Sequence, residues 1–395
     1  MNSARTQAGS RSSIQQWAAV SRPARPIVRE LLINGPQTRT SLAKTLGLST
    51  GSLTRLTKPL VQSGLLVERD IVHDPVNGRP TRPLDIVAED FHFLGIKLTS
   101  THVYAVVTDL RARVVAEAAE PIGDRQPESV IAQARNMMTR LSREGAEPVA
   151  AGFALGGHPQ APGETAAAEV FDAPFLDWWG IPLQPLLDDR MGIPCVVSND
   201  VSALAHSQHW FGAARGLSDF ALVTAGAGIG YSLFIRDHMV TATESNLREF
   251  SHHILDPGGP MCAEGHRGCV ASYLSTHSIL ASAAHGLRRQ VSIEEITRMA
   301  REGDAVCLQV TRQAGWALGA VIATVVNITM VKTVVVAGES VEVARTGKRH
   351  IERGMGHRRH RDYRSIDIPM LSADFTEWAR GGAVAAIRTF VAGTS

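Results

Sequence analysis

The sequence has few cysteines and no long apolar run, and both absences narrow the kind of protein it can be. Four cysteines among 395 residues do not make a disulfide framework, which fits a reducing compartment. The longest apolar runs, such as Thr333–Ala337, are far shorter than the roughly 20 residues of a membrane-spanning helix. The first residues, Met1–Gln16, are polar and lack the apolar centre of an export signal. We therefore expect a cytoplasmic protein with no membrane partner.

Positive charge is unevenly distributed along the chain. The length predicts more than one domain, and the net charge is only +2 overall. Residues 1–88, however, hold twelve Lys and Arg against five Asp and Glu, a net charge of +7, which leaves −5 for the remainder. A basic N-terminal segment beside a mildly acidic remainder indicates contact with a polyanion such as DNA. A solvated basic surface is the alternative.

A helix-turn-helix is predicted near the N-terminus. Apolar residues recur at helical spacing in Pro26–Ile33, in Arg39–Leu46 and in a helix that begins after Ser49. Thr38 and Ser49 are suited to cap the second and third helices, and Gly47 suits the left-handed end of the second. Two short helices joined by such a tight turn make a helix-turn-helix, whose later helix would enter the major groove of DNA.

The third helix and the hairpin after it carry the predicted DNA contacts. Small polar and basic side chains suit base edges and phosphates, and the outward face of the helix offers Thr50, Ser52, Thr54, Arg55 and Lys58. Leu65–Arg69 and Pro83–Val87 are predicted strands. The loop between them would form a wing, whose Arg79 could reach phosphates or a minor groove. The alternative is a three-helix domain that serves only protein contacts.

The rest of the chain alternates strand and helix patterns. His92–Leu98 and His102–Asp109 are predicted to be adjacent antiparallel strands, and Phe220–Thr224 with Gly228–Ile235 a second hairpin. Further strands and helices follow each hairpin. This twofold pattern predicts two α/β lobes with a cleft between them, near residues 199–252.

Both parts of the sequence resemble the ROK (repressor, ORF, kinase) family. The stretch from Ile27 to Val87 is similar to the winged helix of ROK repressors, through Gly47-Leu48-Ser49, Gly64-Leu65 and Gly78-Arg79-Pro80. The remainder resembles the ROK sugar-kinase domain. The resemblance implies an α/β protein with a winged helix-turn-helix in residues 1–88. A two-lobed, actin- and hexokinase-like (ribonuclease H-like) ROK domain would follow in residues 89–395.

Four residues match the sugar contacts of ROK kinases. In the best-matching motif, Val197–Ala205, the asparagine matching Asn199 holds the sugar and the aspartate matching Asp200 is the general base. Glu249-Phe-Ser-His252 resembles the family's Glu-x-Gly-His, whose glutamate and histidine bind sugar hydroxyls. The resemblance therefore implies a sugar or sugar derivative bound by Asn199, Asp200, Glu249 and His252. The alternative for Asn199-Asp200 is a plain helix cap.

The segment from Cys262 to Cys269 resembles the family's zinc loop, Cys-x-Cys-Gly-x-x-Gly-Cys. Glu264 replaces the second cysteine, and a glutamate oxygen can also ligate zinc. A structural zinc held by His252, Cys262, Glu264 and Cys269 is therefore expected, with His266 as a spare ligand. The alternative is a loop that has lost its metal. Ala271 stands where the family has a sugar-binding glutamate, so one expected sugar contact is missing.

The nucleotide side departs from the family pattern. Lys97-Leu-Thr-Ser-Thr101 stands where ROK kinases have Asp-x-Gly-Gly-Thr. A lysine cannot replace a carboxylate on Mg²⁺, and side chains in place of the glycines block close backbone approach to phosphate. The glycine loop Ala225–Gly230 is present, but Ala337-Gly338 keeps only one of two glycines that pack on adenosine in the family. We therefore expect no ATP, no magnesium and no kinase activity.

Together these patterns predict a transcriptional repressor of carbohydrate-metabolism genes. It would bind double-stranded operator DNA as a homodimer or homotetramer and respond to a sugar. One alternative is an active, ATP-dependent ROK-type sugar kinase with an appended DNA-binding domain, and another is a DNA-binding scaffold without a ligand. The basic run Lys348–Arg364 is either a second DNA contact or a solvated face. Trp178-Trp179 is suited to stack on a sugar or to pack in the core.

Overall fold

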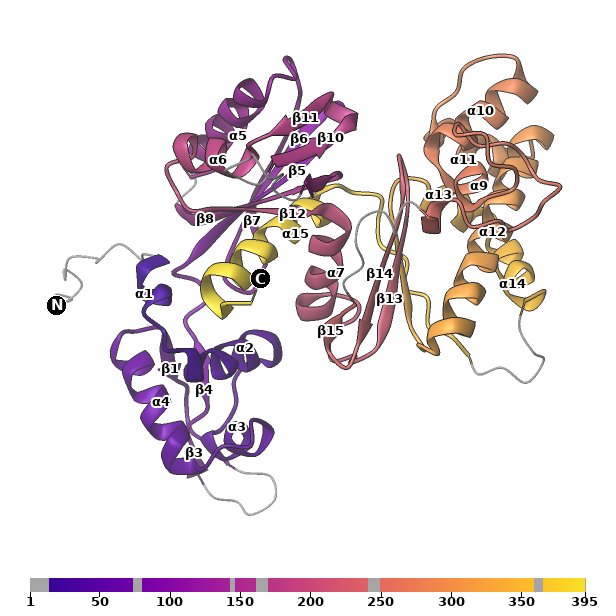
Figure 1. The fold of residues 1–395 in the computed structure, drawn as a ribbon. Helices are drawn as coiled ribbons and strands as arrows, with labels where there is room; N and C mark the ends of the chain where they lie inside the picture. Colours follow the sequence, from indigo (N-terminus) through magenta and orange to yellow (C-terminus); the bar gives the residue numbers. More distant parts are fainter. Residues whose placement is uncertain are drawn as a thin grey trace, which may run out of the picture. The chain divides into compact units, whose positions relative to one another are not determined.

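The chain forms two compact units in the computed structural model (Figure 1), which describes residues 14–73, 80–142, 146–160, 170–240, 249–358 and 365–394. Residues 1–211 and 375–395 make the first unit, and residues 212–374 make the second. The last segment of the chain thus returns to complete the first unit. The expected boundary at residue 88 lies inside that unit and stays a prediction.

Residues 14–88, called the head below, contain the predicted helix-turn-helix. The helices are α1 (Ile14–Ala18), α2 (Arg25–Asn34), α3 (Arg39–Thr45) and α4 (Thr50–Gln62), with a 3-10 turn η1 (Arg22–Ala24) before α2. Antiparallel pairs follow, β1 (Leu66–Glu68) with β4 (Leu84–Ile86) and β2 (Val72–His73) with β3 (Pro80–Thr81). Thr38 Oγ1 accepts from the Ser41 amide at 3.2 Å, and Ser49 Oγ accepts from the Ser52 amide at 3.1 Å. The predicted helices, caps and wing strands are therefore confirmed.

A five-stranded sheet forms the centre of the first unit. Its order is β12 (Cys195–Asn199), β8 (Pro148–Leu155), β5 (His92–Leu98), β6 (His102–Thr108) and β7 (Val114–Pro121). The first three strands are parallel, and β6 and β7 run antiparallel to their neighbours. Figure 1 shows α5 (Pro127–Ser142) and α6 (Leu183–Arg190) on one side of this sheet and α7 (Asp200–Phe211) and α15 (Thr376–Ile387) on the other. The first unit also contains a small sheet, whose strand order is β11 (Trp178–Ile181), β10 (Val170–Ala173) and β9 (His158–Gln160). The 3-10 turn η2 (Pro174–Leu176) lies between β10 and β11 in the chain.

Glycines allow α15 to lie directly on the sheet. A Cβ atom at Gly382 would come within 2.5 Å of the Gly152 carbonyl oxygen of β8, and one at Gly95 of β5 within 2.0 Å of the Ala379 carbonyl oxygen. Both distances are far below normal contact, so only glycine fits at these crossings. The backbone of α15 therefore touches the backbone of two central strands.

The head shares a hydrophobic core with the end of α15. The helix continues into a π-helical turn, η3 (Arg388–Ala392), and Ile387 and Val391 lie in the same buried cluster as Trp17 and Leu31 of the head. The buried Asp85 of β4 accepts hydrogen bonds from Arg69 of the head and from Arg111, which follows β6. Head, sheet and C-terminal helix are thus one packed body.

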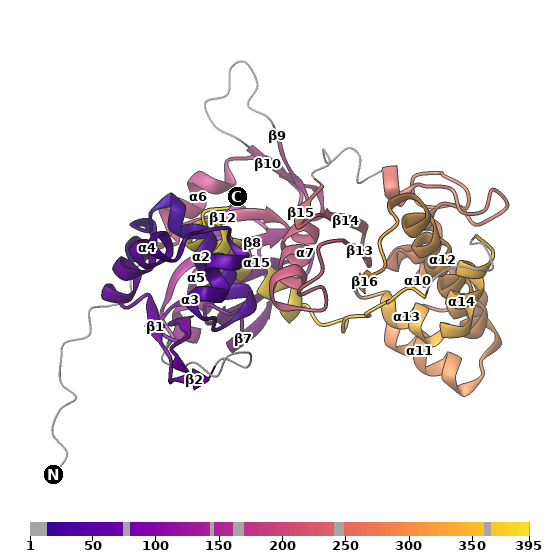
Figure 2. The same ribbon diagram turned by 90° about the horizontal axis from the view of Figure 1, so that it is seen from below.

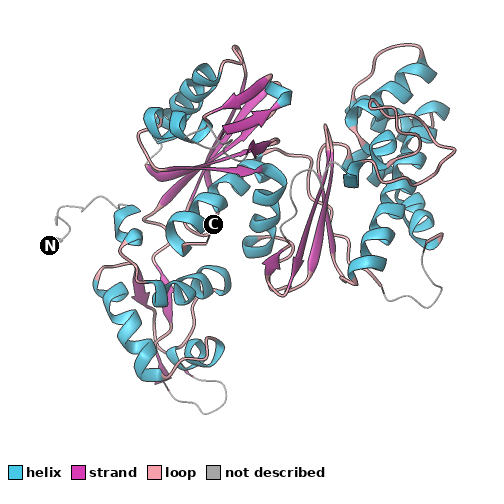
Figure 3. Ribbon diagram, viewed as in Figure 1, coloured by secondary structure: helices cyan, strands magenta, loops and turns pink. Residues whose placement is uncertain are grey.

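The second unit combines a small sheet with a layer of helices. The strand order is β15 (His238–Met239), β14 (Ile229–Ile235), β13 (Phe220–Ala225) and β16 (Val334–Ala337). Figure 3 shows the helices gathered on one side of this sheet, and Figure 2 shows α12 among its neighbours. They are α9 (Val270–Leu274), α10 (Thr276–Leu287), α11 (Ile293–Glu302), α12 (Ala305–Thr329), α13 (Val341–Thr346) and α14 (Lys348–Gly356). Even the 25-residue α12 does not qualify as a membrane span, and neither does any other helix in the described part of the chain.

Candidate functional sites

The helix α4 presents its predicted DNA-contacting side chains to solvent. Thr50, Thr54, Arg55 and Lys58 are exposed and Ser52 is half-buried. Among the described residues, neither Arg55 nor Lys58 has an ion-pair partner, whereas Arg39 of α3 pairs with Glu68 at 2.6 Å. The charges of α4 are therefore available to a polyanion. Arg79, the predicted wing-tip contact, lies outside the described residues.

The predicted ligand residues Asn199 and Asp200 lie at the carboxyl edge of the five-stranded sheet, where β12 passes into α7. The Asn199 Oδ1 atom accepts hydrogen bonds from the amides of Val201 and Ser202 at 3.0 and 3.2 Å. Its Nδ2 donates to the Gly157 carbonyl oxygen at 3.4 Å. Asn199 thus caps α7, and the capping interpretation describes part of its role. The carboxyl edge of parallel strands is nevertheless where α/β folds commonly bind ligands.

Asp200 is already paired within the protein. Its Oδ2 atom accepts from the ammonium of Lys97, at the end of β5, and its Oδ1 atom accepts from the Val201 amide at 2.9 Å. The side chains of Lys97 and Asp200 are only 7% and 14% exposed. The Lys97 Nζ atom also lies 5.1 Å from the ring centroid of Trp378, in the first turn of α15, a cation–π distance.

The turn that corresponds to the kinase phosphate loop is closed by its own hydrogen bonds. The Thr99 hydroxyl oxygen accepts from the amides of Thr101 and His102 at 3.3 and 2.9 Å, and the Thr99 amide donates to the His102 carbonyl oxygen at 3.0 Å. A phosphate loop works by offering free backbone amides to the ligand. Three amides of this turn already donate hydrogen bonds within the protein and are not free for a phosphate. This disfavours nucleotide binding in addition to the replacement of the metal-binding aspartate by Lys97.

The glycine loop of the second unit, Ala225–Gly230, faces an acidic side chain. A Cβ atom at Gly226 would lie 3.3 Å from the carboxyl carbon of Glu339. Glu339 follows Gly338, which has a φ of +107° and where a Cβ atom would lie only 2.2 Å from the Ala225 carbonyl oxygen. The Thr276 hydroxyl donates to Glu339 Oε1 at 2.8 Å and holds the carboxylate there. A carboxylate against this loop repels a phosphate group by like charge.

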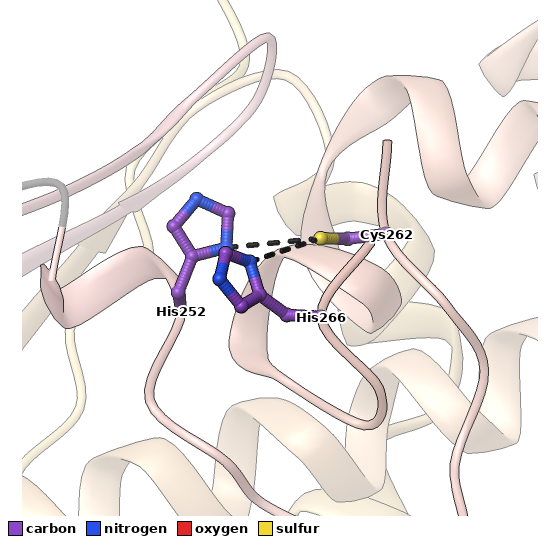
Figure 4. Close-up of side chains that lie close together, drawn as sticks. All are labelled: His252, Cys262 and His266. Atoms are coloured by element: carbon purple, nitrogen blue, oxygen red, sulfur yellow. Dashed lines mark hydrogen bonds between the residues drawn. The ribbon is translucent and has the colours of Figure 1, made fainter. Parts of the chain in front are cut away.

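A cluster of sulfur and imidazole groups lies in the second unit (Figure 4). His252, Cys262 and His266 each offer one possible ligand atom, and these three atoms all lie within 4.8 Å of one another. The His252 Nδ1 atom is 3.7 Å from the Sγ atoms of both Cys262 and Cys269, and His266 Nδ1 is 3.7 Å from Cys262 Sγ. These residues could hold a metal ion, because two thiolates and two imidazoles are a common donor set of tetrahedral zinc.

Glu264 lies on the opposite edge of the His252 ring. Its Oε2 atom is 3.2 Å from His252 Nε2, whereas Nδ1 of the same ring faces the sulfur atoms. A carboxylate in this position orients a metal-binding histidine from behind. The spare ligand His266 is therefore better placed than Glu264 for direct ligation. That Glu264 ligates a metal stays a prediction.

The remaining predicted ligand residues, Glu249 and His252, belong to the second unit, whereas Asn199 and Asp200 belong to the first. That all four bind one ligand stays a prediction.

The two adjacent tryptophans lie in different environments. Trp178 is buried and its indole N–H donates to the Arg125 carbonyl oxygen at 2.6 Å, whereas Trp179 is 64% exposed. Core packing thus applies to Trp178 alone. The basic run Lys348–Arg364 begins on α14, and residues 359–364 lie outside the described part.

Sequence reasoning did not find Trp378 or Glu339 beside these sites. Trp378 is distant in sequence from Lys97, and its approach follows from the C-terminal return of the chain. Glu339 had a local signal, because an acidic residue directly follows Gly338 of a nucleotide-binding motif.

Comparison with known proteins matches the chain to a family. The family model described as "ROK family" matches residues 93–361, which is more than half of the chain. The DNA-binding transcriptional dual regulator NagC of Escherichia coli is 25% identical over 371 residues, which cover 90% of this chain and 89% of NagC. The DNA-binding transcriptional repressor Mlc of the same organism is 25% identical over 308 residues, covering 74% of this chain and 75% of Mlc.

Solved structures show the same fold. The crystal structure of a ROK family transcriptional regulator, a homologue of the Escherichia coli Mlc protein, matches with a TM-score of 0.75 at 20% identity and covers 94% of this chain and 98% of its own. A ROK family glucokinase from Streptomyces griseus matches with a TM-score of 0.62 at 22% identity and covers 75% of this chain and 99% of its own. The fold is therefore a winged helix-turn-helix followed by an actin- and hexokinase-like domain, and the chain belongs to the ROK family.

Proposed function

We propose that this chain is a DNA-binding transcriptional regulator of carbohydrate-metabolism genes, controlled by a sugar bound in a kinase-like domain that no longer transfers phosphate. The observation that carries the proposal is that one chain combines an intact helix-turn-helix with a Lys97–Asp200 ion pair in its kinase-like domain. The relatives NagC and Mlc are named as DNA-binding transcriptional regulators. Residues 1–88 would bind DNA, and residues 89–395 would sense the effector.

The kinase alternative is disfavoured by both phosphate loops. A general base must accept the proton of the attacking hydroxyl, and Asp200 Oδ2 already accepts a hydrogen bond from Lys97. The amides of Thr99, Thr101 and His102 already donate hydrogen bonds within the turn after Lys97. Glu339 faces the glycine loop. Phosphoryl transfer depends on simultaneous positioning and charge neutralisation. The purified protein is therefore expected to phosphorylate none of the common monosaccharides with ATP, and turnover of any of them would restore the kinase alternative.

DNA binding is tested on duplex selected from random sequence by the purified full chain. The variants Arg55→Ala and Lys58→Ala each remove a charge that lacks an ion-pair partner among the described residues. Each lost phosphate contact weakens binding and lowers the slope of log affinity against log salt by about 1. Arg298→Ala is the matched control, because Arg298 is an exposed arginine of α11 paired with Glu302 at 2.8 Å. Equal affinity of all four proteins would exclude α4 as the DNA-reading helix.

Sugar binding is tested by thermal shift with a panel of monosaccharides, because a ligand that binds only the native state raises its stability. An effector must also bind the DNA-competent and DNA-incompetent states with different affinity. We expect at least one neutral sugar to raise Tm and to change DNA affinity. A protein that binds DNA but is stabilised by no sugar would be the ligand-independent scaffold. A homodimer or homotetramer would present paired heads to a two-fold operator.

A structural zinc is proposed at the cluster of His252, Cys262 and His266 in Figure 4. Cys269, whose Sγ atom is 3.7 Å from His252 Nδ1, would be the fourth ligand. When bound, the metal would fix the loop against α9, at whose start Cys269 lies. Elemental analysis of the purified protein should find one zinc per chain, and Cys262→Ser should lose it. His266→Ala should lower zinc affinity more than Glu264→Gln. The opposite order would favour Glu264 as the fourth ligand.

A further inference from the structure

The surroundings of the Lys97–Asp200 pair suggest what kind of group binds there. Lys97 lies near the end of β5 and Asp200 directly follows the parallel strand β12, so their charged atoms meet at the carboxyl edge of the sheet. Beside them Gly156 leaves space: a Cβ atom there would lie 3.5 Å from Asp200 Oδ2 and 3.8 Å from the Phe175 ring. A carbon-sized atom therefore fits over Gly156, in van der Waals contact with Oδ2 and with an aromatic ring.

Both charges of the pair keep unused hydrogen-bonding capacity. The ammonium of Lys97 has three N–H donors, and one of them is directed to Asp200. A carboxylate oxygen accepts more than one hydrogen bond, and a carbon-sized atom fits against Oδ2 on the Gly156 side. A group that enters here meets a donor and an acceptor at the same point.

A neutral hydroxyl satisfies this arrangement completely, because it donates to Asp200 and accepts from Lys97 with one oxygen atom. A ligand ammonium could bind Asp200, but it would be repelled by Lys97. A ligand carboxylate could bind Lys97, but it would be repelled by Asp200. With side chains this little exposed, such repulsion is only weakly screened.

We propose that Lys97 and Asp200 form one binding element for a neutral hydroxyl of the effector, and that Lys97 is the residue that excludes cationic sugars from this position. The proposal rests on the sugar-sensing function proposed above and specifies the class of ligand. Lys97 contributes to specificity through two effects, since it donates to the ligand oxygen and balances the charge of Asp200.

The test compares neutral and charged sugars on the full-length protein by titration calorimetry. The neutral probes are D-glucose, D-xylose and N-acetyl-D-glucosamine, and the charged probes are D-glucosamine and D-glucuronate. Wild type should bind a neutral probe at least about tenfold more tightly than either charged one, since a hydrogen bond to a charged group contributes about that factor. Lys97→Met should weaken the neutral probe about tenfold and shift the preference toward D-glucosamine, which can then pair with Asp200. Asp200→Asn should shift it toward D-glucuronate.

Controls separate this inference from a loss of folding. Lys332→Met removes an exposed lysine of the second unit and should bind like wild type. Lys97→Arg keeps the positive charge and should keep the discrimination against D-glucosamine. If Lys97→Met binds every probe like wild type, or weakens all of them equally, the inference is wrong while the sensing function stands. If no probe binds the wild-type protein, the sensing function fails as well.

Discussion

The buried ion pair between Lys97 and Asp200 predicts a distinctive pattern of stability changes. With side chains 7% and 14% exposed, each charge depends on the other for its compensation. Removing one partner of such a pair leaves an uncompensated buried charge and costs about 3–5 kcal/mol. Replacing both partners with neutral groups of similar size is often close to neutral. We therefore expect Lys97→Met and Asp200→Asn each to cost about 3 kcal/mol, and the double variant to cost less than either.

The measurement is urea-induced unfolding of the four proteins, followed by far-ultraviolet circular dichroism. Because the chain has two compact units, unfolding can show more than one transition. The free energy of unfolding is compared for the transition whose midpoint changes in Lys97→Met. An exposed pair provides the control, because the side chains of Arg298 and Glu302 of α11 are 58% and 59% exposed. A double-mutant cycle on this pair should give a coupling free energy of at most about 0.5 kcal/mol. Single variants at Lys97 and Asp200 that cost under about 1 kcal/mol and add in the double variant would refute the reasoning.

Three further stability changes follow from the packing of the first unit. Gly382→Ala places a Cβ 2.5 Å from a backbone oxygen and should cost at least about 2 kcal/mol in urea unfolding, whereas Gly51→Ala, with open space around it, should cost nothing. Leu31→Ala should cost about 3 kcal/mol in the same assay, because Leu31 is fully buried. Burial, with the charges of Arg388 and His209, holds the pKa of His206 well below 6.5. Native His206 thus stays neutral at a pH where the unfolded chain gains a proton. As the pH is lowered from about 6.5, the free energy of unfolding should therefore decrease by up to about 1.4 kcal/mol per pH unit. His206→Gln should reduce this decrease in unfolding curves recorded from pH 7 to pH 5.

Local signals accounted for the parts of the fold that the sequence predicted well. Thr38 and Ser49 cap their helices through their own hydroxyls, so the helix starts depend on neighbouring residues only. The hairpin of β5 and β6 also follows from adjacent segments. By contrast, α12 is buried along most of its length and its apolar residues lack a clear one-sided period. The small sheet of β9 to β11 consists of strands too short to give a pattern.

The candidate sites divide in the same way. The exposed residues of α4 follow from helical periodicity, and the Cys262–Cys269 loop is indicated by its resemblance to the zinc loop of the ROK family. The pairing of Lys97 with Asp200 joins residues 103 positions apart, and no local pattern indicates it. The choice between Glu264 and His266 depends on which nitrogen of His252 faces the sulfurs, which is a matter of side-chain orientation.

The return of the chain into the first unit has a consequence for biosynthesis. The residues of α15 and η3 are translated after the whole second unit, yet they supply part of the core beneath the head. While the ribosome is still adding them, Trp17 and Leu31 lack apolar neighbours that they have in the finished molecule. A messenger truncated before residue 375 would therefore yield a head with exposed apolar side chains, a substrate for proteases and chaperones. This order of synthesis couples a stable DNA-binding head to completion of the polypeptide.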